Sequence, residues 1–403
     1  MGKILVVAEN YLYDKSADTN CMRSVLNGLV EHGHEVTILA KDYENYFKRP
    51  EKFNVLYVFQ KSQAIIDRLV LFNSKNPVLK LLCQLLAYFI IFLKLDLKRN
   101  KRAYNHEYRK AEIEGKPYDC VLSFYCPYIS NDIAEYIVKK NKNVKWFMYF
   151  FDPHTYNYQY TKCKTLPRRA RDEKRWAKTA YGVISSYGIL EENERHNFYP
   201  YKDLKNIELT LPNLRLNNDN KTTFSQKSDK KRMVYTGKFY KNIRNPEFLI
   251  KMLNEMDSQF VSAEFYGDSC DYLSENFTAM PDCVSLKGSI PQTHIPELLQ
   301  NADILINIGN TSVNQVPSKV FDYIATGKPI LNVYFNDNDS SLFYLKKYPS
   351  ILNVKVGSEI DISKIEDFIK SAKEVSYEQL YSIYKDYLLD TTIQKIIEFL
   401  ELN

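Results

Sequence analysis

The sequence lacks the cysteine and leader patterns of metal-binding and secreted proteins. Its seven cysteines are odd in number and contain no CxxC pair, which argues against a zinc site or a disulfide framework and favours reduced cytoplasmic thiols. No signal peptide is expected, because the first residues, MGKILVVAEN, already have strand character. Asp337 and Asp339 in FNDNDSS have the spacing of a metal-binding DxD, but a loop after a strand favours turn chemistry. We therefore expect no metal and no cofactor.

Glycine-rich nucleotide motifs are also missing. No GxGxxG follows the first strand of either predicted domain, so a dinucleotide oxidoreductase ranks last among the enzymes considered. No solenoid-type repeat is present. The net charge of +6 is mild; it fits attraction to a polyanion or a membrane surface, and it is also ordinary for a lysine-rich chain.

Long apolar runs are absent as well, with one near exception in the segment 78–102. Residues 81–93 read LLCQLLAYFIIFL, with Gln84 as the one polar member. As a helix this run spans about 20 Å, against about 30 Å of hydrocarbon, so it should not cross a bilayer. The following KLDLKRNKR carries five cations and one acid, which suits anionic head groups. Two interpretations stay open: shallow insertion at a membrane surface, or burial against the sheet of its own domain.

A chain of 403 residues is too long for one ordinary core, so two domains are expected. Apolar strands alternate with amphipathic helices, a pattern that predicts parallel, doubly wound sheets. We expect a Rossmann-like domain over 1–211, a linker over 212–232, a second Rossmann-like domain over 233–378, and a helix over 379–403 that returns to the first domain. The predicted strands are 3–8, 35–40, 120–124, 146–151, 182–186, 208–211, 233–236, 263–266, 304–308 and 330–334.

The stretch PSKVFDYIATGKPIL predicts a short helix that binds an anion. Pro317 suits the first helical position, and the amides of Ser318 and Lys319 would then point outward at the positive end of the helix. Such a terminus is a phosphate site, and Lys319 adds a cation. Asp322, one turn further on, could accept hydrogen bonds from ribose hydroxyls. The alternative is that Lys319 and Asp322 form an exposed ion pair three residues apart.

A second strand–turn–helix unit carries the same signal. In VYTGKFYKNIRNPEFLI a strand ends at Gly237 and Lys238 follows, which places a cation where open α/β sheets bind ligands. Lys241 or Arg244 offers a second charge, and arginine can hold a diphosphate through two hydrogen bonds.

These motifs in series resemble the C-terminal half of GT-B glycosyltransferases, family 4-like. TGKFYKNIRNPEFLI, a strand ending in FYGD, VSLKGSIPQTHIPELLQNADILIN and PSKVFDYIATGKPIL carry the resemblance, and MGKILVVAEN…VLNGLVEHGHEVTILA is similar to their first strand–helix–strand. The resemblance implies two domains facing across a cleft that binds a nucleoside-diphosphate sugar. It also implies roles for individual residues: Lys238 and Arg244 hold the diphosphate together with Ser318 and Lys319, Asp322 the ribose, and the loop at Ser289–Ile290 the base.

The chain departs from the family pattern at two places. Asn314 and Asp322 stand where the family has two glutamates. By this position Asn314 is a candidate catalytic residue, although it cannot supply a carboxylate at the sugar. The loop after the first strand, ENYLYDKSADTN, lacks the usual glycine pair, which leaves the backbone from Asp18 to Asn20 less freedom to approach a donor.

The expected function is transfer of a sugar, from a UDP-sugar by preference, to a saccharide or lipid-linked saccharide during synthesis of a bacterial surface polysaccharide. The enzyme would be metal-independent and, by resemblance, retaining. It would be cytoplasmic or peripheral on the cytoplasmic face of the plasma membrane, with no nucleic-acid partner. Asp152 or His154 in FFDPHTYNY could act as a base; otherwise Asp152 caps a turn and His154 is a surface residue. The alternatives are a nucleotide-sugar epimerase and a degenerate sugar-nucleotide-binding scaffold.

Overall fold

The chain forms two compact units. The structure, a computed structural model, describes residues 1–9, 11, 17–41, 51–58, 69, 77–92, 101–109, 117–125, 129–141, 143–157, 166–216, 230–241, 243–311 and 316–402. The first unit comprises Met1–Pro212 and Thr392–Asn403, and the second comprises Asn213–Thr391.

The first unit is built on a seven-stranded sheet in which all strands are parallel, in the order β3-β2-β1-β4-β5-β6-β7. Its strands are β1 (Lys3–Val7), β2 (Glu35–Lys41), β3 (Asn54–Val58), β4 (Cys120–Phe124), β5 (Lys145–Phe150), β6 (Gly182–Ser186) and β7 (Lys205–Leu209). Its helices include α1 (Ala17–Glu31), α3 (Pro77–Phe92), α5 (Ile129–Lys140), α6 (Leu166–Ala177), α7 (Ile189–Arg195) and most of α15 (Leu389–Phe399).

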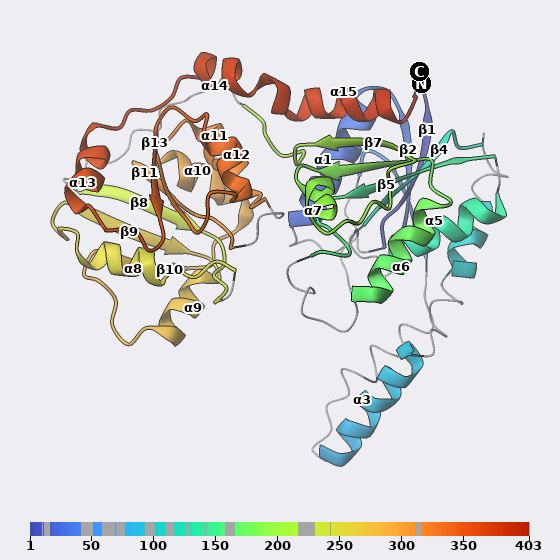
Figure 1. The fold of residues 1–403 in the computed structure, drawn as a ribbon, viewed down its shortest axis with the longest axis horizontal. Coiled ribbons are helices and arrows are strands. Elements are labelled where there is room, and N and C mark those ends of the chain that lie inside the picture. Colours follow the sequence, from blue (N-terminus) through green and yellow to red (C-terminus); the bar gives the residue numbers. More distant parts are fainter. Residues whose placement is uncertain are drawn as a thin grey trace. The chain divides into compact units, whose positions relative to one another are not determined.

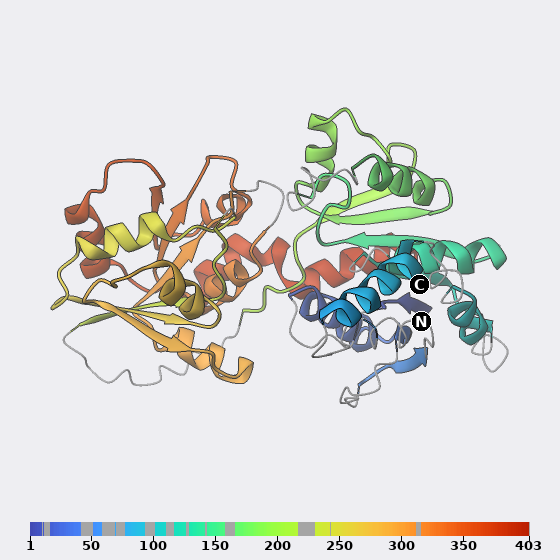
Figure 2. The same cartoon turned by 90° about the horizontal axis from the view of Figure 1, so that it is seen from below.

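Helices cover both faces of this sheet (Figure 1). On one face, α5 and α6 share a core cluster with alternate strand residues through Ile133, Ile137 and Trp176. On the other face, α15 packs against α1 so closely that a Cβ on Gly28 would lie 2.5 Å from Ile393 Cγ1. The two chain ends lie side by side on this unit in both views (Figure 1 and Figure 2).

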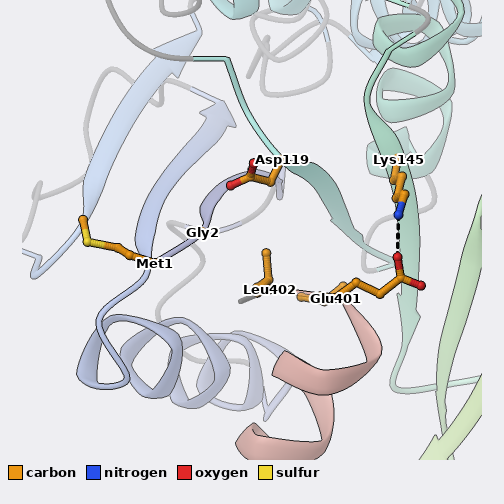
Figure 3. Close-up of a pocket in the computed structure, with 7 residues that line it drawn as sticks. Met1, Gly2, Asp119, Lys145, Glu401 and Leu402 are labelled. Carbon is orange, nitrogen blue, oxygen red and sulfur yellow. Dashed lines mark hydrogen bonds and ion pairs between the residues drawn. The ribbon is translucent and has the colours of Figure 1, made fainter.

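A cavity of about 300 Å³ lies between these chain ends, where Met1, Gly2, Leu400 and Leu402 line it together with Asp119, Lys145 and Glu401 (Figure 3). Glu401 forms ion pairs with both Lys145 and Lys205, and these cations lower the pKa of its carboxyl to about 2. The cavity lies at the amino ends of β1, β4 and β5. It is therefore at the edge opposite to the one where open parallel sheets bind ligands.

The second unit contains a six-stranded parallel sheet in the order β10-β9-β8-β11-β12-β13. Its strands are β8 (Lys231–Thr236), β9 (Val261–Tyr266), β10 (Val284–Gly288), β11 (Ile304–Ile308), β12 (Ile330–Tyr334) and β13 (Ile351–Lys355). Its helices are α8 (Glu247–Asn254), α9 (Ser269–Asn276), α10 (Ile295–Gln300), α11 (Lys319–Thr326), α12 (Ser340–Leu345), α13 (Ile362–Ser371) and α14 (Tyr377–Tyr384). The predicted pair of Rossmann-like, doubly wound parallel sheets is confirmed.

The predicted C-terminal helix over 379–403 is wrong as a single element. The chain instead forms α14, a 3₁₀ turn at Lys385–Tyr387, and α15. Ser376 and Gln379 form a reciprocal capping box that fixes the start of α14.

Helix α3 corrects one interpretation of the apolar segment. Its large apolar side chains from Val78 to Phe89 are 44–64% exposed wherever they are described, so burial against the sheet is wrong for these residues. No helix within the described ranges is long and apolar enough to cross a bilayer.

Candidate functional site

The second sheet changes direction of winding between β8 and β11, which are neighbours in the sheet although the strands β9 and β10 lie between them in sequence. Ligands of open α/β sheets bind beyond the carboxyl ends of strands at such a point. Gly237 and Lys238 follow β8, and Asn310 follows β11. The predicted donor residues thus lie where the topology favours a ligand.

Lys319, the first residue of α11, is tied to the end of β8. Its Nζ donates to the Thr236 carbonyl oxygen at 3.0 Å and lies 3.8 Å from the centre of the Tyr235 ring. Burial lowers the pKa of Lys319 well below its ordinary value, and the positive charge of Arg244 lowers it further. No ion pair within the described residues joins Lys319 to Asp322, so the alternative of a simple exposed pair is wrong.

Tyr323 makes a second connection between α11 and β8. Its hydroxyl accepts a hydrogen bond from the Thr236 backbone amide at 3.2 Å and lies 3.3 Å from Thr236 Oγ1. Lys319 and Tyr323 are four residues apart and therefore share one face of α11. This face holds the start of α11 against the end of the strand.

Arg244 converges on the same strand end. Its Nε and Nη2 donate to Asn310 Oδ1 at 3.2 and 2.7 Å, and Nη1 donates to the Lys238 carbonyl oxygen at 3.4 Å. A backbone hydrogen bond from Thr311 to Ile243 joins the two loops. Asn310 is buried and thus fixes the direction of the guanidinium group.

Lys238 is the most solvent-accessible of the three cations, with 51% of its side chain exposed. Its Nζ lies 3.3 Å from Asp268 Oδ2, at the start of α9. An exposed pair of this kind contributes little to stability. It can be exchanged for another anion at small cost.

Three neighbouring strands end at glycines with positive φ. Gly237, Gly267 and Gly288 have φ values of 129°, 89° and 72°. A Cβ on Gly237 would lie 3.0 Å from Lys319 Nζ, and a Cβ on Gly267 would lie 3.2 Å from the Gly237 carbonyl oxygen. The backbone therefore packs closely at this edge, and half-buried Ile290 follows two residues after Gly288.

Asp322 lies on α11, one turn beyond Lys319, and is exposed. Desolvation by the surrounding protein nevertheless raises the pKa of its carboxyl to about 6. Helix α11 begins later than expected, because Ser318 is its N-cap and Pro317 precedes the cap. Asn314 lies outside the described residues.

In the first unit, Asp152 and His154 follow β5. His154 is 2% exposed, its Nδ1 lies 3.0 Å from the Tyr125 hydroxyl, and its ring packs on Trp176. Burial lowers the pKa of His154 to about 3, with Arg169 and Arg175 adding to the shift. The alternative that His154 is a surface residue is wrong. Asp152 is half-buried.

The DxD-like pair has ordinary structural roles. Asp339 caps α12 by accepting from the Ser341 amide at 2.8 Å, and Asp337 forms an ion pair with Lys355 at 2.6 Å. Turn chemistry is thus confirmed for Asp339. Among the described residues, no three His, Cys, Asp or Glu side chains are grouped to hold a metal ion.

Sequence reasoning missed the residues that orient the cations: Thr236, Tyr323 and Asn310. One signal was available, since Tyr323 is four residues after Lys319 on a helix. Asn310 had only its position after a buried strand to indicate it.

No protein-family profile matches the sequence, and no curated protein does. Solved structures do match over nearly the whole chain. Sucrose-phosphate synthase from Thermosynechococcus elongatus is 12% identical at a TM-score of 0.67, with 100% of this chain and 98% of that chain covered. A lipopolysaccharide outer core galactosyltransferase, WaaB, is 12% identical at 0.62, with 99% and 100% covered.

Anabaena HepE, solved in complex with UDP and glucose, is likewise 12% identical at a TM-score of 0.62, with all of both chains covered. At this level of sequence identity, the structural match shows similarity of fold alone. The chain therefore has the architecture of the GT-B glycosyltransferases, as its sequence motifs predicted.

Proposed function

We propose that the chain is a glycosyltransferase that moves a sugar from a nucleoside-diphosphate sugar to a saccharide or lipid-linked saccharide. One observation carries the proposal: Lys238, Arg244 and Lys319 converge on the Thr236–Lys238 backbone at the switch point of the second sheet. Two adjacent phosphates need several fixed cations, which a metabolite with a single carboxylate would not.

The cations would act on the leaving group. Cleavage of the sugar–phosphate bond leaves negative charge on the diphosphate, and preorganised donors stabilise such charge without a metal. Arg244 is preorganised by Asn310, and Lys238 is free to exchange Asp268 for phosphate. We propose a metal-independent reaction on this basis, and a retaining one by resemblance alone.

Recognition of the nucleoside would fall to the neighbouring residues. Asp322 would accept hydrogen bonds from the ribose hydroxyls, and the Ser289–Ile290 loop would contact the base. We propose UDP as the nucleotide, since HepE, which has the same fold, was solved with UDP. Asp152 is the better candidate for a base at the acceptor, because His154 is enclosed and its pKa is about 3. No role is assigned to Asn314 beyond its place in the motif.

The proposed acceptor belongs to a bacterial surface polysaccharide, with the enzyme peripheral on the cytoplasmic face of the plasma membrane. The exposed apolar helix α3 supports this location. An enzyme bound at a bilayer surface would encounter lipid-linked acceptors by diffusion in the plane of the membrane.

Calorimetric titration with UDP-, GDP-, ADP- and dTDP-sugars tests the donor site. We expect one nucleotide to bind, and Lys238→Ala to weaken it by about 10- to 100-fold, the usual loss for a charged hydrogen bond. Lys251→Ala, an exposed lysine on α8 of the same unit, is the matched control and should change nothing. Binding without transfer or hydrolysis would favour the scaffold, and interconversion of the donor sugar would favour the epimerase. No binding of any nucleotide sugar would refute the proposal.

A further inference from the structure

Helix α3 presents a contiguous apolar face to solvent. Val78, Leu81, Leu82, Leu85 and Phe89 are 64, 56, 56, 55 and 57% exposed. Single exposed apolar residues are normal on a protein surface, but a contiguous set on one helix marks an interaction site. A helix with such a face normally binds another apolar surface or the hydrocarbon region of a bilayer.

Two other helices of the first unit carry exposed charge of one sign. Helix 101–109 and α6 are held on the same sheet face by Tyr104, Tyr108 and Trp176, which belong to one core cluster, and Lys178 lies in the turn directly after α6. Every exposed charged side chain on these two helices is a cation. This cationic surface comprises Arg102, Arg109, Arg168, Arg171, Lys174 and Lys178.

The acids of this region are withdrawn from the surface. Asp132 is buried and pairs with Arg175. Half-buried Asp172 pairs with Arg175 as well, at 3.4 Å. The carboxylates thus offset mainly the inner cations, although Asp172 also lies 4.0 Å from Arg168 of the cationic surface.

The chain joins the two features directly. Lys101, the first residue of helix 101–109, lies 3.9 Å from Asp132, beside Arg175 of α6. From Phe92 at the end of α3 to Lys101 the chain can extend at most about 30 Å. The intervening sequence LKLDLKRN contributes three further cations and one acid. The apolar helix is therefore tethered close to the cationic surface.

We propose that α3 inserts into the interface of an anionic lipid bilayer while the cationic surface binds its head groups. Apolar insertion and electrostatic attraction are the two contributions that together give stable peripheral binding. A nucleic acid would match the cations but offers no apolar phase to α3. A second copy could cover α3 but would bring two cationic surfaces together. This inference specifies the membrane location proposed above and does not depend on the transfer chemistry.

Flotation with phosphatidylcholine vesicles, with and without phosphatidylglycerol, tests the proposal on the full chain. We expect wild type to float with the anionic vesicles and to be released by high salt. Leu81→Asp/Leu85→Asp should abolish flotation. Arg168→Glu/Arg171→Glu/Lys174→Glu should weaken anionic binding on the order of 100-fold, at about five-fold or more for each cation lost near an anionic surface.

Matched variants of the second unit make the same kinds of change at another place in the chain. They show whether the position of the changed residues matters, or only the change in net charge or apolarity. Lys364→Glu/Lys370→Glu/Lys373→Glu and Tyr381→Asp alter exposed residues and should float like wild type. Failure of wild type to bind anionic vesicles would overturn the proposal. So would a wild-type dimer that Leu81→Asp/Leu85→Asp converts to monomer, or preference for nucleic acid over vesicles. Flotation by a protein that binds no nucleotide sugar would support this inference and contradict only the transferase function.

Discussion

Lys319 Nζ donates to the carbonyl oxygen of Thr236 at 3.0 Å, so the first residue of α11 is fixed to the last residue of β8. The lysine is desolvated there and lies near Arg244, and both effects favour its neutral form. An anion bound at this strand end would reverse that balance.

Binding of a nucleoside diphosphate should be accompanied by proton uptake. The phosphate charge raises the pKa of Lys319, so the lysine takes up a proton where it was partly neutral. Calorimetry in buffers of different ionisation enthalpy measures the number of protons taken up on binding. Lys319→Met should bind more weakly and lose the uptake; uptake that persists in the variant would assign the proton to another group.

Affinity for the nucleotide should increase as pH rises through about 6. The carboxyl of Asp322 has its pKa raised to about 6, and only its ionised form can accept from both ribose hydroxyls. Titrations from about pH 5 to about pH 8 should show the rise in wild type. Asp322→Asn should bind weakly and lose this rise near pH 6, while any fall in affinity at higher pH that comes from proton uptake by Lys319 should remain. An unchanged profile in this variant would contradict the ribose contact.

Asn310→Ala should weaken nucleotide binding by roughly 5- to 20-fold, since it leaves Arg244 without its buried acceptor. Asn245→Ala is the control, because Asn245 accepts from the Glu247 amide at the start of α8 and does not orient Arg244. The control should lower the melting temperature without changing the dissociation constant. Equal loss of affinity in both variants would mean that the loop as a whole, and not Asn310, positions the guanidinium.

Gly237→Ala should reduce both stability and nucleotide binding. A Cβ at φ 129° is strained and would lie 3.0 Å from Lys319 Nζ, with an expected cost of about 1–3 kcal/mol. Gly357→Ala separates the two effects, because Gly357 also has positive φ but nothing lies within 4 Å of its added Cβ. It should lose stability and keep its affinity. Normal nucleotide binding by Gly237→Ala would show that Lys319 does not reach the ligand.

Glu173→Gln should remove a pH dependence of unfolding in the first unit. Thr155 and Tyr201 donate hydrogen bonds to the buried Glu173 carboxyl, and burial raises its pKa from 4.5 to about 7. Between these values the folded state holds a proton that the unfolded state releases, so wild-type stability should fall as pH rises from about 4.5 to about 7. Denaturant titrations of wild type and variant should diverge within this window and run parallel above it.

The sheets were largely predictable, because central parallel strands are buried on both faces. Strands β4, β6, β11 and β12 have the predicted bounds, and nearly all of their residues are buried. The strands β3, β10 and β13 were not predicted, and all three are edge strands. Their residues are mostly half-exposed, and polar residues interrupt the apolar pattern in β10 (VSLKG) and β13 (ILNVK), whereas β3 (NVLYV) is apolar and was missed all the same.

The candidate site was predictable as far as local sequence specifies it. Strand–turn–helix patterns placed Lys238, Arg244 and Lys319 at one sheet edge, and the structure brings them together. Asn310 could not be found in this way, since its role comes from a contact 66 positions away in sequence. The exposure of α3 was equally hidden, because a helix that is apolar all round fits a core and an interface alike.

Helix α15 has a practical consequence for dividing this chain. It closes the first unit through Ile393 and Phe399, whereas the second unit is one uninterrupted stretch from Asn213 to Thr391. A gene fragment that stops at Pro212 would lack the helix that covers Gly28 and Phe147, and its product should aggregate. The stretch 213–391, by contrast, is continuous in sequence, but its last three residues form the start of α15. An exchange of the second unit should therefore end before Leu389, so that α15 stays whole.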